Sequence, residues 1–559
     1  MLPSAPDAAG LATLAAELRL PAPVCALLLR RGFGLPDDAK RYLRPRLEQL
    51  HDPGLMRGMA DAVARLTRAI DGGETILVHG DYDVDGMSST ALLVRVIRAL
   101  GGTAVPFIPH RLTDGYDLSD AGVDAAIRGG ARVLLTCDCG TSALAAVARA
   151  CAAGIDVIIS DHHLPGGPLP DCLAILNPRQ PGCEYPDKSL VAAGIAYKLA
   201  IALVRAMGGD ESLVHRHLDL VALATVADVA PLRGENRVLA RLGLRLLSQR
   251  PSVGLRALVR AVGLDGKSIT AGRVGFVLAP RLNAVGRIGH AIRGVELLLA
   301  DDEHTANAIA RELEEMNRER QRIDRETLAT AMRRVESLDL DASVGLVIAE
   351  PGWHPGVIGI VASRVVEEVC RPTVLIALEG DVGKGSGRSI PAFDLHGALT
   401  SCRDLFMRFG GHRAAAGVTI ASSRVEEFAE RFNAVAREAL SPDDLVHELR
   451  VDLELPLGHA TEELDALLRH FEPFGIGNPA PVFVARGVRL AGAPRTVGQG
   501  HLKLRLEQEG AVLDAIGFGL GALAADLRAD ERVDVAFRLE LDEWDGAPRL
   551  QARLADVRA

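Results

Sequence analysis

The sequence lacks the features that mark secreted and membrane proteins. It contains no apolar run of about 18 residues, the length that spans a bilayer, and Met1-Leu2-Pro3-Ser4 begins neither a basic nor an apolar signal segment. Its eight cysteines are scattered, and the closest pair, Cys137 and Cys139, lacks the spacing of a zinc site. We therefore expect a cytoplasmic protein with free buried thiols and no contact with a membrane.

The chain also contains few aromatic residues and no excess of positively charged residues. Aromatic residues make up 4% of the chain, and 63 Lys and Arg stand against 73 Asp and Glu, for a formal net charge of −10. This balance is mild evidence against a nucleic-acid partner, because such proteins usually carry a basic footprint. It does not exclude one, because an acidic metal centre and a local basic groove can coexist in an enzyme with several domains.

The length and the hydrophobic pattern predict an α/β protein of several domains, because 559 residues are too many for one core. Expected strands over 75–79, 103–108, 132–137 and 155–160 alternate with expected helices over 87–100, 119–129 and 141–153, and helices over 189–207 and 212–226 follow. This βαβ series predicts a doubly wound, mainly parallel sheet, whose ligands gather outside the carboxyl ends of its strands.

The other segments predict helical regions and two further compact domains. The expected domains are an N-terminal helical extension (1–70), the doubly wound domain (71–235), a helical linker region (236–340) with a long connecting helix over 302–337, a second, smaller α/β domain (341–440), and a C-terminal β-barrel of OB type (448–559). In the barrel we expect strands over 502–506 and 533–541 and one helix near 519–528.

Acidic and histidine clusters fall on successive elements of the predicted sheet. They are His79 with Asp81, Asp83 and Asp85, then Asp138, then Asp161-His162-His163, and then Asp228. A single Asp after a strand usually caps a helix, but random capping would not concentrate Asp and His while leaving Ser and Thr in the minority. Crowded carboxylates are costly unless a cation lies among them, and carboxylates with imidazoles suit Mn²⁺, Mg²⁺ or Zn²⁺ rather than Ca²⁺. The sequence therefore predicts a metal centre with enough ligands for two ions.

These clusters, in this order and spacing, resemble the motifs of the DHH phosphoesterase superfamily. The later segments narrow the resemblance to the bacterial branch that degrades single-stranded DNA; they are 280–287 (PRLNAVGR), 353–359 (WHPGVIG), 384–389 (KGSGRS), 410–417 (GGHRAAAG) and 473–479 (PFGIGNP). The resemblance runs from about residue 75 to residue 559. It implies a DHH domain, a DHH-associated domain and a nucleic-acid-binding OB barrel in the places given above.

The resemblance also implies the roles of the site residues, around two Mn²⁺ or Mg²⁺ ions that share Asp138. The ligands would be His79, Asp83 and Asp138 for one ion, and Asp85, Asp138, His162 and Asp228 for the other. Asp81 would be a ligand or would support one, and His79 is the least secure ligand. His163 would face the scissile phosphate as a hydrogen-bond donor or acid.

Several segments are candidates for contacts to the substrate. The glycine-rich segment 383–388 predicts a turn whose backbone amides approach a phosphate, with Ser386 and Arg388 as side-chain donors. Arg111, Arg281 and Asn283 resemble residues at the family's 5′-phosphate pocket, and His412 is expected to touch the substrate unless it caps a tightly packed helix start. Weaker candidates are Trp353 and His354, which stack on bases or belong to the core, and Arg495, Lys503 and Arg505 on the barrel.

The resemblance implies a metal-dependent 5′→3′ exonuclease specific for single-stranded DNA, acting in recombination and repair. The alternative is a related phosphoesterase acting on short oligonucleotides, cyclic dinucleotides or pyrophosphate, although such proteins usually lack a barrel like 448–559. A non-catalytic DNA-binding scaffold is a weaker alternative, because scaffolds generally lose the metal ligands that this chain retains. The expected partners are single-stranded DNA with a 5′ end, a helicase and a single-strand-binding protein, and we expect a monomer.

Overall fold

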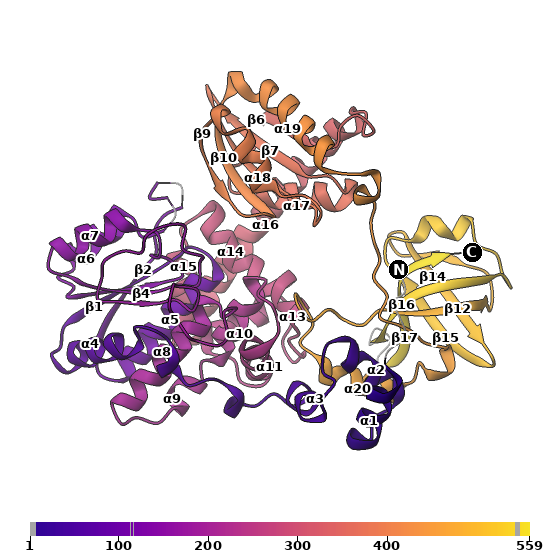
Figure 1. Cartoon of the computed structure of the whole chain (residues 1–559), viewed down its shortest axis with the longest axis horizontal. Helices are drawn as coiled ribbons and strands as arrows, with labels where there is room; N and C mark the ends of the chain where they lie inside the picture. The colour runs from indigo at the N-terminus through magenta and orange to yellow at the C-terminus, as the bar shows by residue number, and fades with distance from the viewer. Residues whose placement is uncertain (1–6, 112, 116, 543–547, 559) are drawn as a thin grey trace.

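The computed structural model describes residues 7–111, 113–115, 117–542 and 548–558. Figure 1 shows a core body that contains the first α/β domain, a second α/β domain above it, and a β-barrel to one side with the N-terminal helices beneath it. The first four residues, where no signal segment is expected, lie outside the described residues, as does residue 559 at the end of the predicted barrel.

The first α/β domain is built on a parallel sheet, as predicted, and this sheet has five strands. Its strands are β1 (Thr75–Gly80), β2 (Thr103–Phe107), β3 (Val133–Cys137), β4 (Asp156–Ser160) and β5 (Ala174–Leu176), in the order β2-β1-β3-β4-β5. The sequence does not predict β5, because three residues are too few to show a periodic pattern. The strand order reverses between β1 and β3, so their carboxyl ends border the crevice in which such sheets bind ligands.

Helices cover both faces of this sheet. They are α4 (Met59–Asp71), α5 (Val84–Ala99), α6 (Asp120–Arg128), α7 (Leu144–Ala152), α8 (Ala192–Ala206), α9 (Ser212–His215) and α10 (Leu218–Ala227). Ile76 and Val78 of β1 pack into the core formed with α4, α5 and α8, whereas Leu77 packs on the other face with α6 and α7. This alternation follows the two-residue period of a strand.

Two of the predicted helices differ in the structure. The expected helix 87–100 begins at Val84, because Asp83 Oδ1 accepts hydrogen bonds from the amides of Asp85 (2.9 Å) and Gly86 (3.1 Å) and caps the helix. The single helix expected over 212–226 is two helices, α9 and α10. Only Val214 of α9 is buried, whereas α10 is buried over most of its length, so the two run in different environments.

Most of the predicted linker region belongs to the core body. Its helices are α11 (Gly234–Gln249), α12 (Val253–Ala261), α13 (Ala271–Arg273), the π-helical turn η3 (Val274–Leu278), α14 (Ala279–Ile288), α15 (Ile292–Leu299) and the long α16 (Glu303–Glu336). Leu239, Leu255, Leu282 and Leu297 are fully buried and share one core with β1 and α5. Only the C-terminal half of α16 leaves this core, and there Ala331 and Val335 pack with the second α/β domain.

The second α/β domain has a mixed five-stranded sheet in the order β6-β7-β8-β10-β9. Its elements are β6 (Leu346–Pro351), α17 (Ile358–Val369), β7 (Thr373–Glu379), β8 (Val382–Arg388), α18 (Leu395–Ser401), β9 (Phe406–Gly411), β10 (Ala415–Ala421) and α19 (Val425–Ala439). The predicted glycine-rich turn 383–388 is therefore wrong, because this segment is strand β8, paired on both sides. Glycine is needed in this strand because neighbouring side chains leave little room for a Cβ. A Cβ at Gly385 would lie 2.5 Å from Val418, and one at Gly387 would lie 3.0 Å from Leu395.

The C-terminal domain is a closed barrel, as predicted, because β12 pairs with both β14 and β16. Its strands are β11 (Leu453–Glu454), β12 (Phe483–Leu490), β13 (Arg495–Val497), β14 (His501–Gln508), β15 (Ala511–Gly517), β16 (Arg532–Asp542) and β17 (Arg549–Arg558), and α20 (Glu462–Leu468) precedes β12. The helix expected near 519–528 is a short 3₁₀ turn, Gly521–Ala525. Small apolar side chains in that stretch suit either form.

Residues 7–70 divide between two cores instead of forming one peripheral extension. The helices α1 (Ala8–Leu18), α2 (Ala22–Arg30) and α3 (Pro36–Leu43) share a hydrophobic core with the barrel, whereas α4 packs in the core body. In the described part of the chain no single helix is long and apolar enough to cross a membrane, and α1 and α2 meet the length and composition only as a pair bent by 120°.

A loop at the start of the barrel joins it to the core body and to the N-terminal helices. Asn478 is buried; its Nδ2 donates to the carbonyls of Phe471 and Pro473 (both 2.8 Å), and its Oδ1 accepts from the Tyr42 hydroxyl (2.7 Å). On the other side of the loop the Leu232 amide donates to the Ile476 carbonyl at 2.8 Å. The segment 473–479 is therefore a docking loop between domains.

Candidate metal centre and phosphate pocket

The acidic clusters meet at the carboxyl end of the sheet, as predicted. Asp81 follows β1, Asp138 follows β3 and His162 follows β4, while Asp85 lies in the first turn of α5 and Asp228 caps the end of α10. Asp138 has a positive φ of 67°, a conformation that is unusual outside glycine and typical of functional sites. Parallel strands place these side chains together because their carboxyl ends lie at one edge of the sheet.

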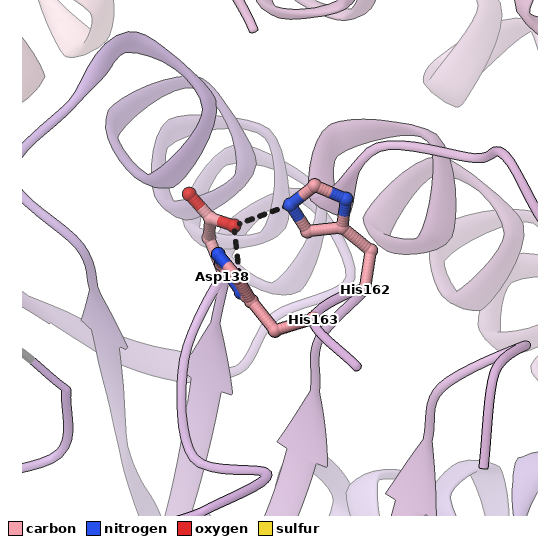
Figure 2. Close-up of side chains that lie close together, drawn as sticks. All are labelled: Asp138, His162 and His163. Atoms are coloured by element: carbon pink, nitrogen blue, oxygen red, sulfur yellow. Dashed lines mark ion pairs between the residues drawn. The ribbon is translucent and has the colours of Figure 1, made fainter. Parts of the chain in front are cut away.

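Among the described residues, three groups of side chains have ligand atoms that lie within 4.8 Å of one another. They are Asp81 with Asp83 and Asp138, Asp85 with His162 and Asp228, and Asp138 with His162 and His163. Figure 2 shows the last group, in which both imidazoles point toward one Asp138 oxygen. His162 Nε2 lies 3.1 Å from Asp138 Oδ1 and 3.9 Å from oxygens of Asp85 and Asp228. Asp138 and His162 therefore connect the groups into one centre.

Backbone amides hold two of the carboxylates in place. Asp85 accepts hydrogen bonds from the amides of Ala192 and Ala193 at the start of α8, both at 2.8 Å. Asp83 accepts from the first amides of α5, as described above. Helix N-termini stabilise negative charge through their unpaired amides. Both carboxylates are therefore fixed before any cation binds.

The carboxylates of this centre are crowded and buried, so a positive charge among them would stabilise their ionised form. Burial, followed by repulsion from neighbouring carboxylates, raises the pKa values of Asp81, Asp85 and Asp138 well above the usual range and raises the pKa of Asp228 to about 7. Asp81 Oδ1 and Asp138 Oδ1 are buried and accept no hydrogen bond from the described residues. Oxygen and imidazole donors with unsatisfied lone pairs are the ligands that Mn²⁺ and Mg²⁺ take. The residues present therefore fit divalent cations.

The two adjacent histidines have opposite protonation properties. Burial, followed by the charge of His163, lowers the pKa of His162 to about 3, so its imidazole is neutral and suited to a metal. Burial also opposes charge on His163, but its Nδ1 lies 2.8 Å from Asp161 Oδ1, and this hydrogen bond and the Asp161 charge raise its pKa to about 9. Asp161 in turn accepts from the amides of His162, His163 and Thr141. His163 is thus an imidazolium at neutral pH.

His79 lies outside all three ligand groups, although the sequence predicts it as a ligand. Its ring packs on Phe107 with centroids 5.2 Å apart, and its Nδ1 lies 3.5 Å from Cys139 Sγ. Helix α6 covers the other nitrogen, because a Cβ at Gly122 would lie 2.6 Å from His79 Nε2. Asp81 occupies the corresponding place in the ligand group.

Arginines from three elements gather beside the acidic cluster. Arg111 follows β2, with its guanidinium 4.8 Å from the centre of the Tyr82 ring; Arg287 lies on α14 and Arg388 at the end of β8. Burial, followed by the charges of Arg111, Arg320 and Arg388, lowers the pKa of Arg287 to about 10. Among the described residues, no carboxylate lies within ion-pair distance of these three arginines. The sequence motif 280–287 contains Arg287, but the predicted set omits it.

Ser386 and Arg388 face the same side of β8. Arg388 Nη1 lies 3.2 Å from Ser386 Oγ, and a Cβ at Gly359 of α17 would come within 2.9 Å of Ser386 Oγ and 3.1 Å of Arg388 Nη2. Gly359 therefore leaves room for the two donors. The predicted pairing of Ser386 with Arg388 is compatible with this geometry, although a strand presents them instead of a turn.

Other predicted contacts have partners within the protein. Arg281 Nε donates to Glu314 of α16 at 2.8 Å, so its charge is already paired. Asn283 Oδ1 accepts from the Val84 amide at 3.2 Å, which places Asn283 against the start of α5 next to Asp83. Trp353 packs against the core of the second α/β domain, and His354 Nδ1 accepts from the Gly356 amide at 3.0 Å. His412 is exposed in the hairpin turn between β9 and β10, which excludes a helix-capping role.

Comparison with known families matches three successive segments of the chain. The DHH family N-terminal domain matches residues 75–225, the DHHA1 domain matches 342–438, and the RecJ OB domain matches 451–556. The single-stranded-DNA-specific exonuclease RecJ of Bacillus subtilis is 36% identical to this chain over 559 residues, covering 99% of this chain and 70% of that protein. The chain belongs to the RecJ family.

Solved RecJ structures have the same fold and contain divalent ions. The crystal structure of RecJ from Thermus thermophilus in complex with Mn²⁺ aligns with a TM-score of 0.86 at 33% identity, over 100% of this chain and 79% of that one. The complex of the same protein with Mg²⁺ aligns with a TM-score of 0.80 at 32% identity, over 100% and 78%. RecJ membership confirms the predicted fold class, with a parallel-sheet DHH domain, a long helix, a mixed-sheet DHHA1 domain and an OB domain.

The RecJ OB domain carries a row of cations across neighbouring strands. Strand register places Arg495 opposite Lys503, Lys503 opposite Ile516, Ile516 opposite Arg553, and Arg553 opposite Arg538. Side chains directly opposite in neighbouring strands share one face. Phe518 is 49% exposed beside this row, and the Arg553 guanidinium lies 5.1 Å from its ring centre.

This cation row includes two of the predicted residues. Arg505 lies one step further along β14, opposite Asp514, so an acidic neighbour offsets its charge. Sequence alone does not find Arg538 and Arg553, because they join the row only through the pairing of distant strands.

Proposed function

We propose that this protein is a single-strand-specific DNA exonuclease that hydrolyses phosphodiester bonds from the 5′ end with two divalent ions, Mn²⁺ or Mg²⁺. The observation that carries the proposal is the position of the arginine cluster (Arg111, Arg287 and Arg388) beside the carboxylate and imidazole cluster. A terminal phosphate bound by the arginines places the next phosphodiester bond near the metal ligands. Membership of the RecJ family supports the substrate class.

The ligand groups suggest how the ions are held. Asp81, Asp83 and Asp138 would hold one ion, and Asp85, Asp138, His162 and Asp228 would hold the other. When bound there, two such ions would supply the positive charge that favours ionisation of a water molecule and offsets the charge of the phosphate in an in-line displacement. We place Asp81 in the position that the sequence gives to His79, because the His79 ring nitrogens face Cys139 and α6.

His163 is suited to act on the scissile phosphate. Its hydrogen bond to Asp161 orients the ring and keeps it protonated at neutral pH, so that the other ring nitrogen can donate to a phosphate oxygen or give a proton to the leaving oxygen. His162, held neutral, remains with the metal ligands. The two neighbours thus have different roles because Asp161 contacts the ring of only one of them.

The arginine cluster sets the polarity of the reaction. A 5′-terminal phosphate carries more negative charge than an internal phosphodiester, and several guanidinium groups with Ser386 favour it by bidentate hydrogen bonds. The expected result is that a strand labelled at either end loses nucleotides from its 5′ end only. Release of labelled product from the 3′ end first, or equal degradation of a blunt duplex, would contradict the proposal.

The OB domain favours long strands over short substrates. Its cation row and Phe518 match the combination of phosphate contacts and base stacking that binds single strands without sequence preference. A phosphoesterase of dinucleotides or pyrophosphate does not need this surface. Comparing kcat/KM for a dinucleotide and for a 5′-phosphorylated strand of about 20 nucleotides decides between them, and we expect the longer strand to be preferred.

We further propose that the protein acts as a monomer and that a helicase and a single-strand-binding protein supply its substrate on duplex DNA. The part that concerns the helicase and the single-strand-binding protein follows from specificity for single strands, since a duplex has to be opened first. Light scattering at micromolar concentration tests the monomer, and stimulation of degradation of a blunt duplex by a helicase tests the second part. A stable dimer, or degradation of the blunt duplex without help, would contradict them.

A further inference from the structure

The long helix α16 buries polar side chains where it passes from one domain to the next. Its buried side is apolar before and after this point, because Leu313 packs in the core body and Ala331 packs in the second α/β domain. The buried residues between these two are all polar: Asn317, Arg320, Asp324 and Thr327. We call these four residues the polar junction. Polar groups are costly to bury without partners, so the contacts of the polar junction should have a purpose.

Asp324 connects the polar junction to the second α/β domain. It is 1% exposed, and its side chain lies 3.1 Å from Arg364 Nη2 on α17 and 3.8 Å from Arg320 Nη1. Arg320 Nη2 also donates to Asn317 Oδ1 at 2.8 Å. Figure 1 shows α16 entering the second α/β domain, where it lies against α17. The ion pair of Asp324 with Arg364 therefore links these two helices.

The start of α17 contacts two members of the arginine cluster. Arg287, from the core body, donates through Nη1 to the Gly356 carbonyl at 3.1 Å, two residues before α17 begins. Gly359, in the first turn of α17, lies against Arg388, because a Cβ there would lie 3.1 Å from Arg388 Nη2. Arg364 follows Gly359 by five residues, which is about 7.5 Å along a helix. The place of α17 therefore affects how Arg287 and Arg388 lie relative to each other.

We infer that Asp324 is a positioning residue for the terminal phosphate of the strand. The inference rests on the proposed exonuclease activity and concerns the same phosphate pocket. Asp324 holds α17 through Arg364. In that place α17 keeps Arg287 of the core body and Arg388 of the second α/β domain within reach of one phosphate. Asp324 acts through these cations, since a carboxylate would itself repel a phosphate.

The ion pair fixes the place of α17 more closely than an apolar contact would. Replacing a buried ion pair by apolar residues of similar volume is often neutral or stabilising, so stability alone does not explain a buried Asp324. A carboxylate and a guanidinium attract each other in a defined geometry, whereas apolar surfaces are not directional. A misplacement of about 1 Å at a binding site costs up to about a hundredfold in rate. A loosened α17 should therefore weaken the use of the 5′-phosphate.

The test compares Asp324→Asn with the wild type on a single strand that carries either a 5′-phosphate or a 5′-hydroxyl, in saturating Mn²⁺. We expect Asp324→Asn to raise KM for the phosphorylated strand by between about tenfold and about a hundredfold, and to change kcat by less than about twofold. On the 5′-hydroxyl strand both constants should equal those of the wild type. A purely structural role would instead lower kcat on both strands to the same degree, and that result would overturn the inference.

Arg364→Ala tests the same ion pair from α17 and decides the question if Asp324→Asn does not fold, because the Arg364 side chain is 44% exposed. It should raise KM for the phosphorylated strand by a similar factor, and the double variant should behave like the single ones. Glu326→Gln is the control and should change nothing, because Glu326 is exposed and pairs with Arg322 on α16 itself.

The ratio of kcat/KM for the two strands separates the outcomes. A wild type that prefers the 5′-phosphate, together with an unchanged ratio in folded Asp324→Asn or in Arg364→Ala, would overturn the inference. A wild type that degrades neither strand, or that has no preference for the 5′-phosphate, would overturn the proposed function instead.

Discussion

Asp228 offers a direct test of the electrostatics of the metal centre, because Asp228→Asn removes a charge and keeps the shape of the side chain. Burial and then repulsion from Asp83 raise the folded-state pKa of Asp228 from 3.8 to about 7. Between those values the folded state keeps the proton and the unfolded state loses it. The stability of the metal-free protein therefore falls as the pH rises from about 4 to about 7, and stays low above that.

The size of the effect follows from this shift. One pKa unit corresponds to about 1.4 kcal/mol, so Asp228 lowers the unfolding free energy by about 4 kcal/mol at pH 8, where it is ionised in the folded state, and by about 2 kcal/mol at pH 5, where it has to take up a proton on folding. Asparagine does not ionise, so it has no such effect on the unfolding free energy at either pH. Asp228→Asn should therefore stabilise the metal-free protein by these amounts, more at pH 8 than at pH 5, and should lose metal binding.

Hydrogen exchange of the α10 amides in EDTA measures this stability where Asp228 caps the helix. Asp171→Asn, which neutralises an exposed carboxylate in the same domain, serves as the control and should change nothing. Saturating Mn²⁺ should protect the wild type and leave Asp228→Asn unaffected. Equal or lower protection of α10 in Asp228→Asn at pH 8 would refute the reasoning.

The remaining predictions concern single residues. Asp138→Ala should lower kcat/KM on a 5′-phosphorylated strand by about a thousandfold or more, which is about 4 kcal/mol, with an unchanged circular dichroism spectrum; retained activity would exclude Asp138 as a shared ligand. His79→Gln should keep Mn²⁺ binding measured by calorimetry, whereas Asp81→Asn should lose it, and the reverse result would restore His79 as the ligand. Arg388→Ala should abolish the preference for a 5′-phosphate over a 5′-hydroxyl, as seen in paired rate measurements. Arg553→Ala should reduce the dependence of log Kd on log salt concentration by about one unit, and an unchanged slope would remove Arg553 from the DNA surface.

The residues of the metal centre are predictable from sequence because each lies at the end of a short, regular element. A buried strand followed by Asp fixes the position of that Asp at the carboxyl edge of the sheet. Three strand ends of this kind, together with Asp228 at the end of a helix, predict one centre. The choice between His79 and Asp81 is not predictable in this way. His79 belongs to β1 and Asp81 directly follows it, so the two-residue period of a strand puts both on one side, and the packing of α6 on the His79 ring decides between them.

The phosphate donors show where local sequence misleads. Alternate glycines in 383–388 suggest a turn, but they are needed because β7, β10 and α18 press on that face of β8. Arg281 and Arg287 lie on the same helix, α14, and their local sequence does not show which of them has an acidic partner. Only tertiary contacts show that Glu314 pairs with Arg281, while Arg287 stays among other arginines.

The core that α1, α2 and α3 share with the OB domain has a consequence for synthesis. Leu27 and Tyr42 are buried against the barrel, and Tyr42 bonds to Asn478. The N-terminal helices leave the ribosome hundreds of residues before the barrel strands that cover them. Their apolar faces are therefore exposed to solvent while the DHH and DHHA1 domains are synthesised. The N-terminal helices can therefore finish folding only after the OB domain is synthesised. If the chain is released before that point, their apolar faces stay accessible to chaperones and proteases.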